Sequence, residues 1–275
     1  MRDSVVFYCS GNSPSFDFLP EDIYGRGLGG AEQSLCLVAE ALMFLGYKVT
    51  VYNRHSRPDP IQVHRSIVFI DHRRIEYRPS FDDTLVIFRV PDFRFRGAKT
   101  IWWSTDQITT NNYLEFAATV DEIVVISEFH RDYMSREWGI PKEQMRVIDL
   151  PVAYSRYSYA LERKDYSAIF CSVPHRGLWY LLDAWRELSK AVKSLVITSD
   201  YTLWGGLPDN HEYRQIAEGL EGIEFLGNVP KSQLIDLQLS RWIFPYPHHS
   251  YVPSRGGNVH VELFCVSVAE CQAAG

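Results

Sequence analysis

The sequence ends on VELFCVSVAECQAAG, in which two glutamates, Glu262 and Glu270, stand eight positions apart. Glu262 follows the loop HHSYVPSRGGNVH, and no local structural rule requires a carboxylate there. Ser267 and Glu270 have the S-x-x-E form of a capping box, in which both side chains bind backbone N–H groups of a new helix. This capping alternative predicts a helix start at this point and no ligand for Glu270.

Four glycines in YGRGLGGAEQ, Gly25, Gly27, Gly29 and Gly30, directly precede the first helix that the sequence predicts. Glycines let backbone N–H groups approach a ligand, and a helix N-terminus favours a phosphate. A dinucleotide fingerprint would follow its strand immediately. Here SGNSPSFDFLPEDIY intervenes after the first strand, which counts against an NAD-dependent oxidoreductase. The alternative is a mobile loop with a glycine-rich helix start.

A second candidate phosphate contact lies in CSVPHRGLWYLLDAW, where Arg176 and Gly177 stand between a predicted strand and a predicted helix. A guanidinium beside helix-terminal amides is suited to a diphosphate. The alternative is an exposed arginine in an ordinary strand-to-helix loop.

The composition is that of a soluble globular protein, with 275 residues of which 46% are apolar and 23% charged. The net charge of −6 argues against a nucleic-acid binder. We interpret the basic residues Arg89, Arg94, Arg96 and Lys99 as a solvated face rather than a polyanion site. The five cysteines show no CxxC spacing, which predicts small buried side chains in a reducing cytoplasm and neither a disulfide framework nor a zinc site.

Short β-rich runs alternate with amphipathic stretches along the chain, which predicts an α/β fold. The first half has strands in VVFYCS, KVTVYN, TLVIFRV, KTIWWS and EIVVIS, and a helix in AEQSLCLVAEALMFLG with Gly46 as its cap. The pattern restarts with SAIFCS, a helix in GLWYLLDAWRELSKA, SLVITS, IEFLG, a helix in KSQLIDLQLS, and RWIFPYP. We predict two Rossmann-like domains, 1–152 and 167–275, joined by a linker at 153–166, with the ligand at the carboxyl ends of the strands in the cleft between them.

Four features in this order resemble one family: GGAE, RGLWYLLDAW, GNVPKSQLIDLQLS, and the E-x7-E of Glu262 and Glu270. The chain resembles a GT-B-fold retaining glycosyltransferase of the group called glycosyltransferase family four. The resemblance covers most of the chain and is weakest in the middle of the first domain. In the family, AECQAAG is followed by further strands and helices. We therefore expect the second domain to be incomplete at its C-terminus, as in a fragment of a longer protein rather than a naturally shortened chain.

The resemblance implies that a nucleotide-sugar donor binds mainly to the second domain and an acceptor to the first. Glu270 resembles the glutamate that accepts hydrogen bonds from the ribose hydroxyls. Glu262 resembles the glutamate that lies nearest the transferred sugar. Between them, the backbone N–H groups around Val266, Ser267 and Val268 would face the diphosphate.

No two aspartates have the Asp-x-Asp spacing that holds a metal in many transferases, so we predict no metal and no cofactor. The charge that develops on the leaving β-phosphate would then be stabilised by helix N-termini, by Arg176 and by the loop at Gly29 and Gly30. Cys171 and Ser172 stand where relatives carry a basic residue, so that a hydroxyl at Ser172 would replace one phosphate contact.

Asp106 in IWWSTDQ follows a strand and resembles the region where relatives carry a His-Asp pair near the acceptor. Thr105 occupies the histidine position here, so Asp106 is either an acceptor contact or a plain loop carboxylate. The loop 248–260 either carries specificity through Arg255 and Asn258 or is an insertion.

The implied function is metal-independent, retaining transfer of a hexose from a nucleoside-diphosphate sugar to a glycan, lipid-linked or protein-linked acceptor, as in polysaccharide biosynthesis. One alternative is a nucleotide-sugar-binding protein without turnover, and a less favoured one is a GT-B sugar-nucleotide epimerase. We expect a cytoplasmic protein with no nucleic-acid partner. Peripheral membrane contact stays open, because acceptors in this family are often membrane-linked although no amphipathic basic helix stands out.

Overall fold

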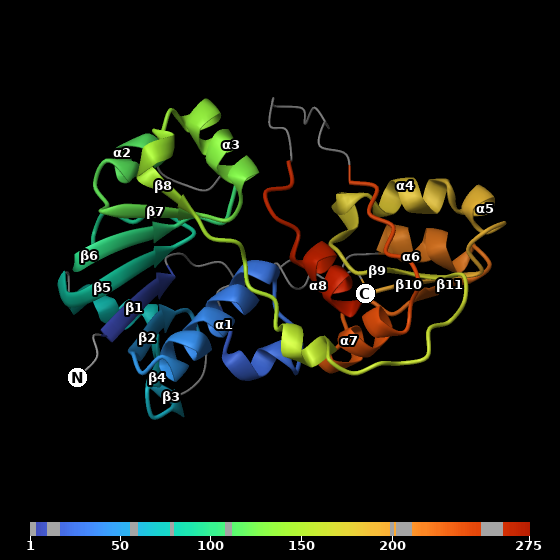
Figure 1. The fold of residues 1–275 in the computed structure, drawn as a ribbon, viewed down its shortest axis with the longest axis horizontal. Coiled ribbons are helices and arrows are strands. Elements are labelled where there is room, and N and C mark those ends of the chain that lie inside the picture. Colours follow the sequence, from blue (N-terminus) through green and yellow to red (C-terminus); the bar gives the residue numbers. More distant parts are fainter. Residues whose placement is uncertain are drawn as a thin grey trace. The chain divides into compact units, whose positions relative to one another are not determined.

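The structure is a computed structural model that describes residues 4–9, 17–55, 60–77, 80–107, 112–198, 201, 211–248 and 261–275. The chain divides into two compact units (Figure 1), Met1–Pro20 with Ala31–Pro151, and Glu21–Gly30 with Val152–Gly275. Each unit contains a sheet with parallel strands and its own helices. The α/β class with two Rossmann-like units, which the sequence predicts, is confirmed.

The first unit is built on a sheet in the order β3-β4-β2-β1-β5-β6-β7-β8, in which only β3 pairs with its neighbour antiparallel. Because β1 lies between β2 and β5, the strand order reverses beside β1, which is where doubly wound sheets bind ligands. The strands are β1 (Ser4–Cys9), β2 (Lys48–Asn53), β3 (Ile61–His64), β4 (Ile67–Asp71), β5 (Ser80–Phe88), β6 (Arg96–Trp103), β7 (Glu122–Val125) and β8 (Met145–Val147).

The helices of the first unit begin and end at local signals in the sequence. Gly46 has a φ of +89° and its N–H donates to the carbonyl of Met43 at 2.8 Å, which ends α1 as predicted. Ser127 caps α3 by accepting the N–H of His130 at 2.9 Å. The helices are α1 (Gly30–Phe44), α2 (Tyr113–Ala117) and α3 (Glu128–Trp138), with short 3-10 turns η3 (His72–Tyr77) and η4 (Lys142–Gln144). The turn η2 (Pro20–Ile23) belongs to the second unit from Glu21 onward.

An aromatic cluster fastens α2 to the carboxyl end of β6. Trp102 is fully buried, and its ring centroid lies 4.9 Å from that of Tyr113 and 5.4 Å from that of Phe116. Its indole N–H donates to the carbonyl of Arg89 at 3.1 Å, which also fixes the end of β5. Met134 of α3 belongs to the same buried cluster, so both helices pack on this face of the sheet.

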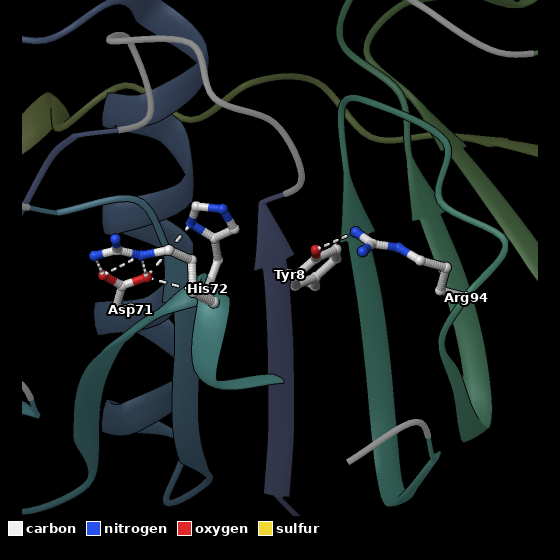
Figure 2. A network of polar contacts seen from close by, with 5 residues as sticks. Tyr8, Asp71, His72 and Arg94 are labelled. Atoms are coloured by element: carbon white, nitrogen blue, oxygen red, sulfur yellow. Dashed lines mark hydrogen bonds and ion pairs between the residues drawn. The ribbon is translucent and has the colours of Figure 1, made fainter. Parts of the chain in front are cut away.

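Polar contacts lie at the carboxyl ends of β1 and β4 (Figure 2). Arg94 donates to the Tyr8 hydroxyl at 2.9 Å. It also pairs with Asp92. Burial, and to a lesser degree Asp92, raises the pKa of Tyr8 above its ordinary value. At the end of β4, the hydrogen bond from Arg73 lowers the pKa of Asp71 to about 2. At neutral pH the Tyr8 hydroxyl is therefore uncharged and the Asp71 carboxylate is charged.

The second unit has a parallel sheet in the order β11-β10-β9, extended on the β9 side by a parallel bridge between Ala168 and Ile243. Its core packs the apolar faces of α4, α5 and α6 on this sheet. Its elements are η5 (Tyr154–Tyr157), β9 (Ser167–Phe170), η6 (Pro174–Arg176), α4 (Leu178–Asp183), α5 (Trp185–Leu188), β10 (Ser194–Ile197), α6 (His211–Glu218), β11 (Ile223–Phe225), α7 (Lys231–Leu239) and α8 (Val266–Ala274).

The structure differs from the predicted elements in several places. The strands β3, β4 and β8 were not predicted, although the equally short β11 was. The helix predicted in GLWYLLDAWRELSKA is two short helices that meet at Ala184. The next residue, Trp185, is buried and donates its indole N–H to the carbonyl of Glu221 at 2.8 Å, so a tertiary contact overrides the local helix preference. RWIFPYP contributes only the bridge at Ile243.

The segment 153–166, predicted as a linker, makes specific contacts with α7 and α8. Tyr157 packs with Ile235, Leu239 and Ala274 in one buried cluster. Arg163 donates to the backbone carbonyls of Ala274 at 2.9 Å and of the final glycine at 2.6 Å. The chain therefore runs along the second unit before it enters β9.

We predict that His130 makes the stability of the protein depend on pH. His130 is fully buried, and burial, partly opposed by Asp106, lowers its pKa to about 4. An unfolded histidine binds its proton near pH 6.5, so the free energy of unfolding should fall as the pH is lowered from 6.5 to about 4, by up to roughly 3 kcal/mol. Urea unfolding of wild type and of His130→Gln across this range measures the difference.

The variant should lose most of this pH dependence, whereas His64→Gln, at an exposed position on β3, should retain it. Parallel curves for the wild type and His130→Gln would show that His130 does not titrate in this way.

Candidate functional site

Three separate segments of the second unit meet at the carboxylate of Glu262. Arg176, the last residue of η6, donates Nη1 to Glu262 Oε2. Tyr246 donates its hydroxyl to the same oxygen at 2.5 Å. The side chains of Arg176 and Glu262 are 20% and 22% exposed, so the ion pair is reachable from solvent. The structure therefore brings two of the predicted site residues together and adds Tyr246.

The charges of this cluster are stabilised by their neighbours. Burial opposes the charged form of Arg176, but Glu262, Tyr246 and Cys265 together outweigh it, so the pKa of the guanidinium is raised. Burial, followed by Cys265 and Glu262, raises the pKa of Tyr246. Tyr246 is therefore a neutral phenol that donates a hydrogen bond to a carboxylate.

Gly177 follows Arg176 at a position where the backbone accepts only glycine. Its φ is +107°, and a Cβ there would lie 2.8 Å from the carbonyl atoms of Pro247. The chain that leads out of Tyr246 thus passes directly against the turn that carries Arg176. This close approach accounts for Gly177 by packing, and its predicted role in donor binding stays a prediction.

The start of α8 differs from the capping-box alternative. Cys265 is at the N-cap position, so Ser267 lies inside the first turn, and its hydroxyl donates to the carbonyl of Cys171 at 2.8 Å. Ser267 therefore attaches α8 to the end of β9, and the capping box is wrong. Ser172, the next residue after Cys171, is half-buried.

Glu270 forms a buried ion pair with Lys231 that the sequence did not predict. Lys231 Nζ lies 2.5 Å from Glu270 Oε1, and their side chains are 10% and 4% exposed. Lys231 is the first residue of α7, where the helix dipole disfavours a cation. Burial disfavours the charge as well, so Glu270 is the partner that makes this lysine acceptable. The motif GNVPKSQL contained the residue, but nothing local marked it.

The glycine loop meets the N-terminus of α8. Gly29 is buried, and Gly30 is the first residue of α1. A Cβ on Gly30 would lie 2.9 Å from Val266 Cγ2, and Val266 is the first residue of α8. Gly30, one of the two glycines predicted to approach the donor, is thus adjacent to the helix start predicted to face the diphosphate.

Asp106 lies in the first unit, where both its oxygens bind Arg89. Arg89 Nε and Nη2 donate to them at 2.6 and 2.9 Å, and Nη1 donates to Glu32. Arg89 has a φ of +65°, an uncommon backbone for a residue with a side chain. Burial, partly opposed by Arg89, raises the pKa of Glu32. Arg89 therefore belongs to an internal triad of charges.

The interpretation of Arg89 as part of a solvated basic face is wrong, because its side chain is only 21% exposed. The carboxylates that surround it come from GGAE and from STDQ, which are far from it in the sequence. Whether Asp106 also contacts an acceptor stays a prediction.

Within the described ranges, no group of three or more His, Cys, Asp and Glu side chains is arranged to hold a metal ion. Among the helices of these same residues, none combines the length and apolar character needed to cross a membrane. Arg255 and Asn258, named as specificity candidates, lie outside the described residues.

We predict that removing the ammonium of Lys231 destabilises the protein more than removing the whole pair. Lys231→Met leaves Glu270 buried and unpaired, which should lower the free energy of unfolding by about 3–5 kcal/mol. The double variant Lys231→Met/Glu270→Gln has no buried charge and should recover much of the loss. Chemical unfolding of the two variants and wild type measures this. Equal stability of the single variant and wild type would show that the pair is not buried as described.

No family model matches the chain, and no curated protein matches it. Several solved structures, in contrast, are similar to the chain. The chain is similar to AviGT4, a glycosyltransferase involved in avilamycin A biosynthesis, with 15% identity, a TM-score of 0.66, and coverage of 100% of this chain and 77% of that one. It is similar to WaaG, a glycosyltransferase involved in lipopolysaccharide biosynthesis, with 12% identity, a TM-score of 0.63, and coverage of 98% and 79%.

A third similar structure is Anabaena HepE in complex with UDP, with 12% identity, a TM-score of 0.61, and coverage of 98% of this chain and 78% of that one. At these identities the similarity is one of fold. The chain has the α/β fold that these GT-B glycosyltransferases share.

Proposed function

We propose that the chain is a retaining, metal-independent glycosyltransferase of the family-four type. It would move a hexose from a nucleoside-diphosphate sugar to a glycan, lipid-linked or protein-linked acceptor. The observation that carries the proposal is the cluster of Arg176, Tyr246 and Glu262 in a unit whose fold is shared with glycosyltransferases. HepE, which is similar in fold, was solved with UDP and with UDP and glucose, which supports a nucleotide sugar as the donor.

Arg176 is suited to the diphosphate of the donor. A guanidinium has five N–H donors, so it can bind Glu262 and a phosphate oxygen together. The N-terminal turn of α8 at Ser267, with Gly29 and Gly30 beside it, offers backbone N–H groups to the same anion. Ser172 and Gly177 flank Arg176 and complete the proposed phosphate contacts. Together these groups would stabilise the charge on the leaving β-phosphate without a metal ion.

Glu262 is assigned to the transferred sugar, where its carboxylate would accept hydrogen bonds from sugar hydroxyls. Tyr246 and Arg176 hold that carboxylate in place before the donor arrives. In the proposed reaction the bond from the anomeric carbon to the phosphate oxygen breaks and a bond to the acceptor oxygen forms on the same face. The departing phosphate oxygen takes the acceptor proton, so no side-chain nucleophile is needed.

Glu270 is assigned to the ribose and Asp106 to the acceptor. A carboxylate can accept hydrogen bonds from two vicinal hydroxyls. Lys231 holds Glu270 Oε1, and Arg89 holds Asp106, so both carboxylates are fixed by a cation. These cations also support the second candidate function, a nucleotide-sugar-binding protein without turnover, because each carboxylate is already partly neutralised. Cytoplasmic location and peripheral contact with a membrane-linked acceptor belong to the same proposal.

We predict that the full chain binds one nucleoside diphosphate without a metal. Calorimetric titration with UDP, GDP, ADP and CDP, each with and without EDTA, should show saturable binding of one nucleotide that EDTA leaves unchanged. The reason is that Arg176 and the α8 N-terminus carry the charge compensation. Binding that EDTA abolishes would contradict metal independence, and no binding by the folded chain would contradict the donor site.

We predict that Glu262→Gln reduces transfer far more than nucleotide binding. Replacing the carboxylate with an amide removes the negative charge next to the transferred sugar. Losses of about 10²-fold or more in kcat are typical when a group that acts only in the transition state is removed. Sugar transfer and nucleotide affinity are measured in parallel on the same preparation. Glu187→Gln, which removes an exposed carboxylate on α5, is the matched control and should retain both.

A chain that binds the nucleotide but transfers no sugar to any acceptor would favour the binding protein without turnover. Equal turnover in Glu262→Gln and wild type would remove Glu262 from the reaction.

A further inference from the structure

Two thiols that stand 100 positions apart in the sequence are in contact where α8 packs against the end of β9. Cys171 follows β9 and Cys271 lies in α8, and their Sγ atoms are 3.8 Å apart. Cys171 is buried and Cys271 is half-buried, so one of the two can be reached from solvent. The sequence spacing does not indicate a pair, because only the packing of α8 against the end of β9 brings the sulfurs together.

A glutamine is oriented toward both sulfurs. Gln238 Nε2 lies 3.6 Å from Cys171 Sγ and 3.6 Å from Cys271 Sγ. The hydroxyl of Tyr157 donates to Gln238 Oε1 at 2.8 Å, and this bond determines which end of the amide faces the thiols. An amide N–H directed at sulfur stabilises a thiolate more than a thiol. The contact between the two thiols is thus held by Gln238 of α7, which is itself held by Tyr157 of η5.

We propose that Cys171 and Cys271 form an oxidisable dithiol, which a peroxide converts to a disulfide that fastens α8 to the end of β9. Sequence considerations alone predicted five separate buried thiols. The 3.8 Å separation of their sulfur atoms identifies Cys171 and Cys271 as a pair.

The reaction balances with one peroxide. The Cys271 thiolate attacks one peroxide oxygen, the O–O bond breaks, and Cys271 becomes a sulfenic acid while one water leaves. Cys171 sulfur then displaces the sulfenic oxygen, and the Cys171 proton departs with it as a second water. Two thiols are oxidised and one peroxide is reduced. Cys271 reacts first, because contact with Cys271 and burial both raise the pKa of Cys171 and keep it protonated.

Disulfide formation would change the contact between α8 and the end of β9. An S–S bond is about 2.05 Å long, so the two sulfurs must approach by more than 1.5 Å from their present 3.8 Å. Cys271 follows Glu270 directly, and Ser267 on the same helix binds the carbonyl of Cys171. If the proposed function holds, this change lies beside the residues assigned to ribose and diphosphate, and the oxidised chain binds the nucleotide more weakly.

The test uses the full chain. The folded protein is first reduced, the reductant is removed, and the protein is then treated with hydrogen peroxide. Free thiols are alkylated after unfolding, and the chain is cleaved after glutamate. Because Glu270 lies between Cys265 and Cys271, cleavage there releases CQAAG and separates the two cysteines. We expect CQAAG linked to the peptide that contains Cys171, with the loss of two hydrogen atoms, reversed by a thiol reductant.

Single-cysteine variants test which two cysteines form the disulfide. Cys271→Ser should abolish the linked peptide, and Cys265→Ser, on the same stretch of chain, should retain it. Cys171→Ser gives the same test from the other side, and Cys171→Ala replaces it if a serine at this buried position does not fold. The disulfide closes a 100-residue loop, so the midpoint of thermal unfolding should rise by roughly 5 °C or more in the oxidised wild type and not in Cys271→Ser.

Sulfinic acid on either cysteine, or unmodified thiols in a folded chain, with no linked peptide, would overturn the proposal. Titration of reduced and oxidised chain with the nucleotide that binds the wild type then addresses the donor site. Equal affinity in both forms would overturn the coupling to that site. Absence of nucleotide binding in both forms, together with a linked peptide, would count against the proposed function and not against the dithiol.

Discussion

A buried charge needs a partner, and this requirement determines how α8 is held in the second unit. Glu270 would be costly inside the protein without the ammonium of Lys231, and Lys231 would be costly at the start of α7 without Glu270. Their pairing fixes α7 and α8 to each other. The hydroxyl of Ser267 adds a bond from α8 to the end of β9. The position of Glu262, just before α8, follows from these two attachments.

The same constraint acts in the first unit. Arg89 is held by Asp106 and Glu32, which come from the end of β6 and the first turn of α1. Its left-handed backbone is disfavoured for a residue with a Cβ, and it persists because its N–H donates to Trp103 and its carbonyl accepts from Trp102. Arg89 and Asp106 lie just after β5 and β6, at the carboxyl ends of parallel strands, where α/β sheets bind ligands.

Fold and chemistry support the proposed activity at different levels. The fold is shared with glycosyltransferases, but a fold alone does not define a reaction. The chemistry comes from Arg176, Tyr246 and Glu262, which place a cation and a carboxylate within one hydrogen-bonded cluster. A cation suits a diphosphate, and a carboxylate suits sugar hydroxyls. The proposal joins these two levels and depends on both.

The sequence by itself determined the elements whose signals are local. Alternating apolar runs marked β1, β2, β5, β6 and β7, and Gly46 marked the end of α1. The residue types of the site were also visible, because Glu262 and Arg176 had no clear local structural purpose. Strand β8 and the break at Ala184 were not visible; at Ala184 the reason is that Trp185 is fixed by a distant carbonyl.

Only the tertiary structure decided which residues are partners. Lys231 with Glu270, Arg89 with Asp106, and Cys171 with Cys271 are each far apart in the sequence. The residues next to them in the sequence do not predict these pairs, because the burial of each side chain and its distance from its partner depend on how the helices and strands pack. The capping box with Ser267 and the ion pair with Lys231 are alternative roles for the same glutamate, Glu270. The packing of α8 on α7 selected the ion pair, since it removed Glu270 from water and placed a buried cation beside it.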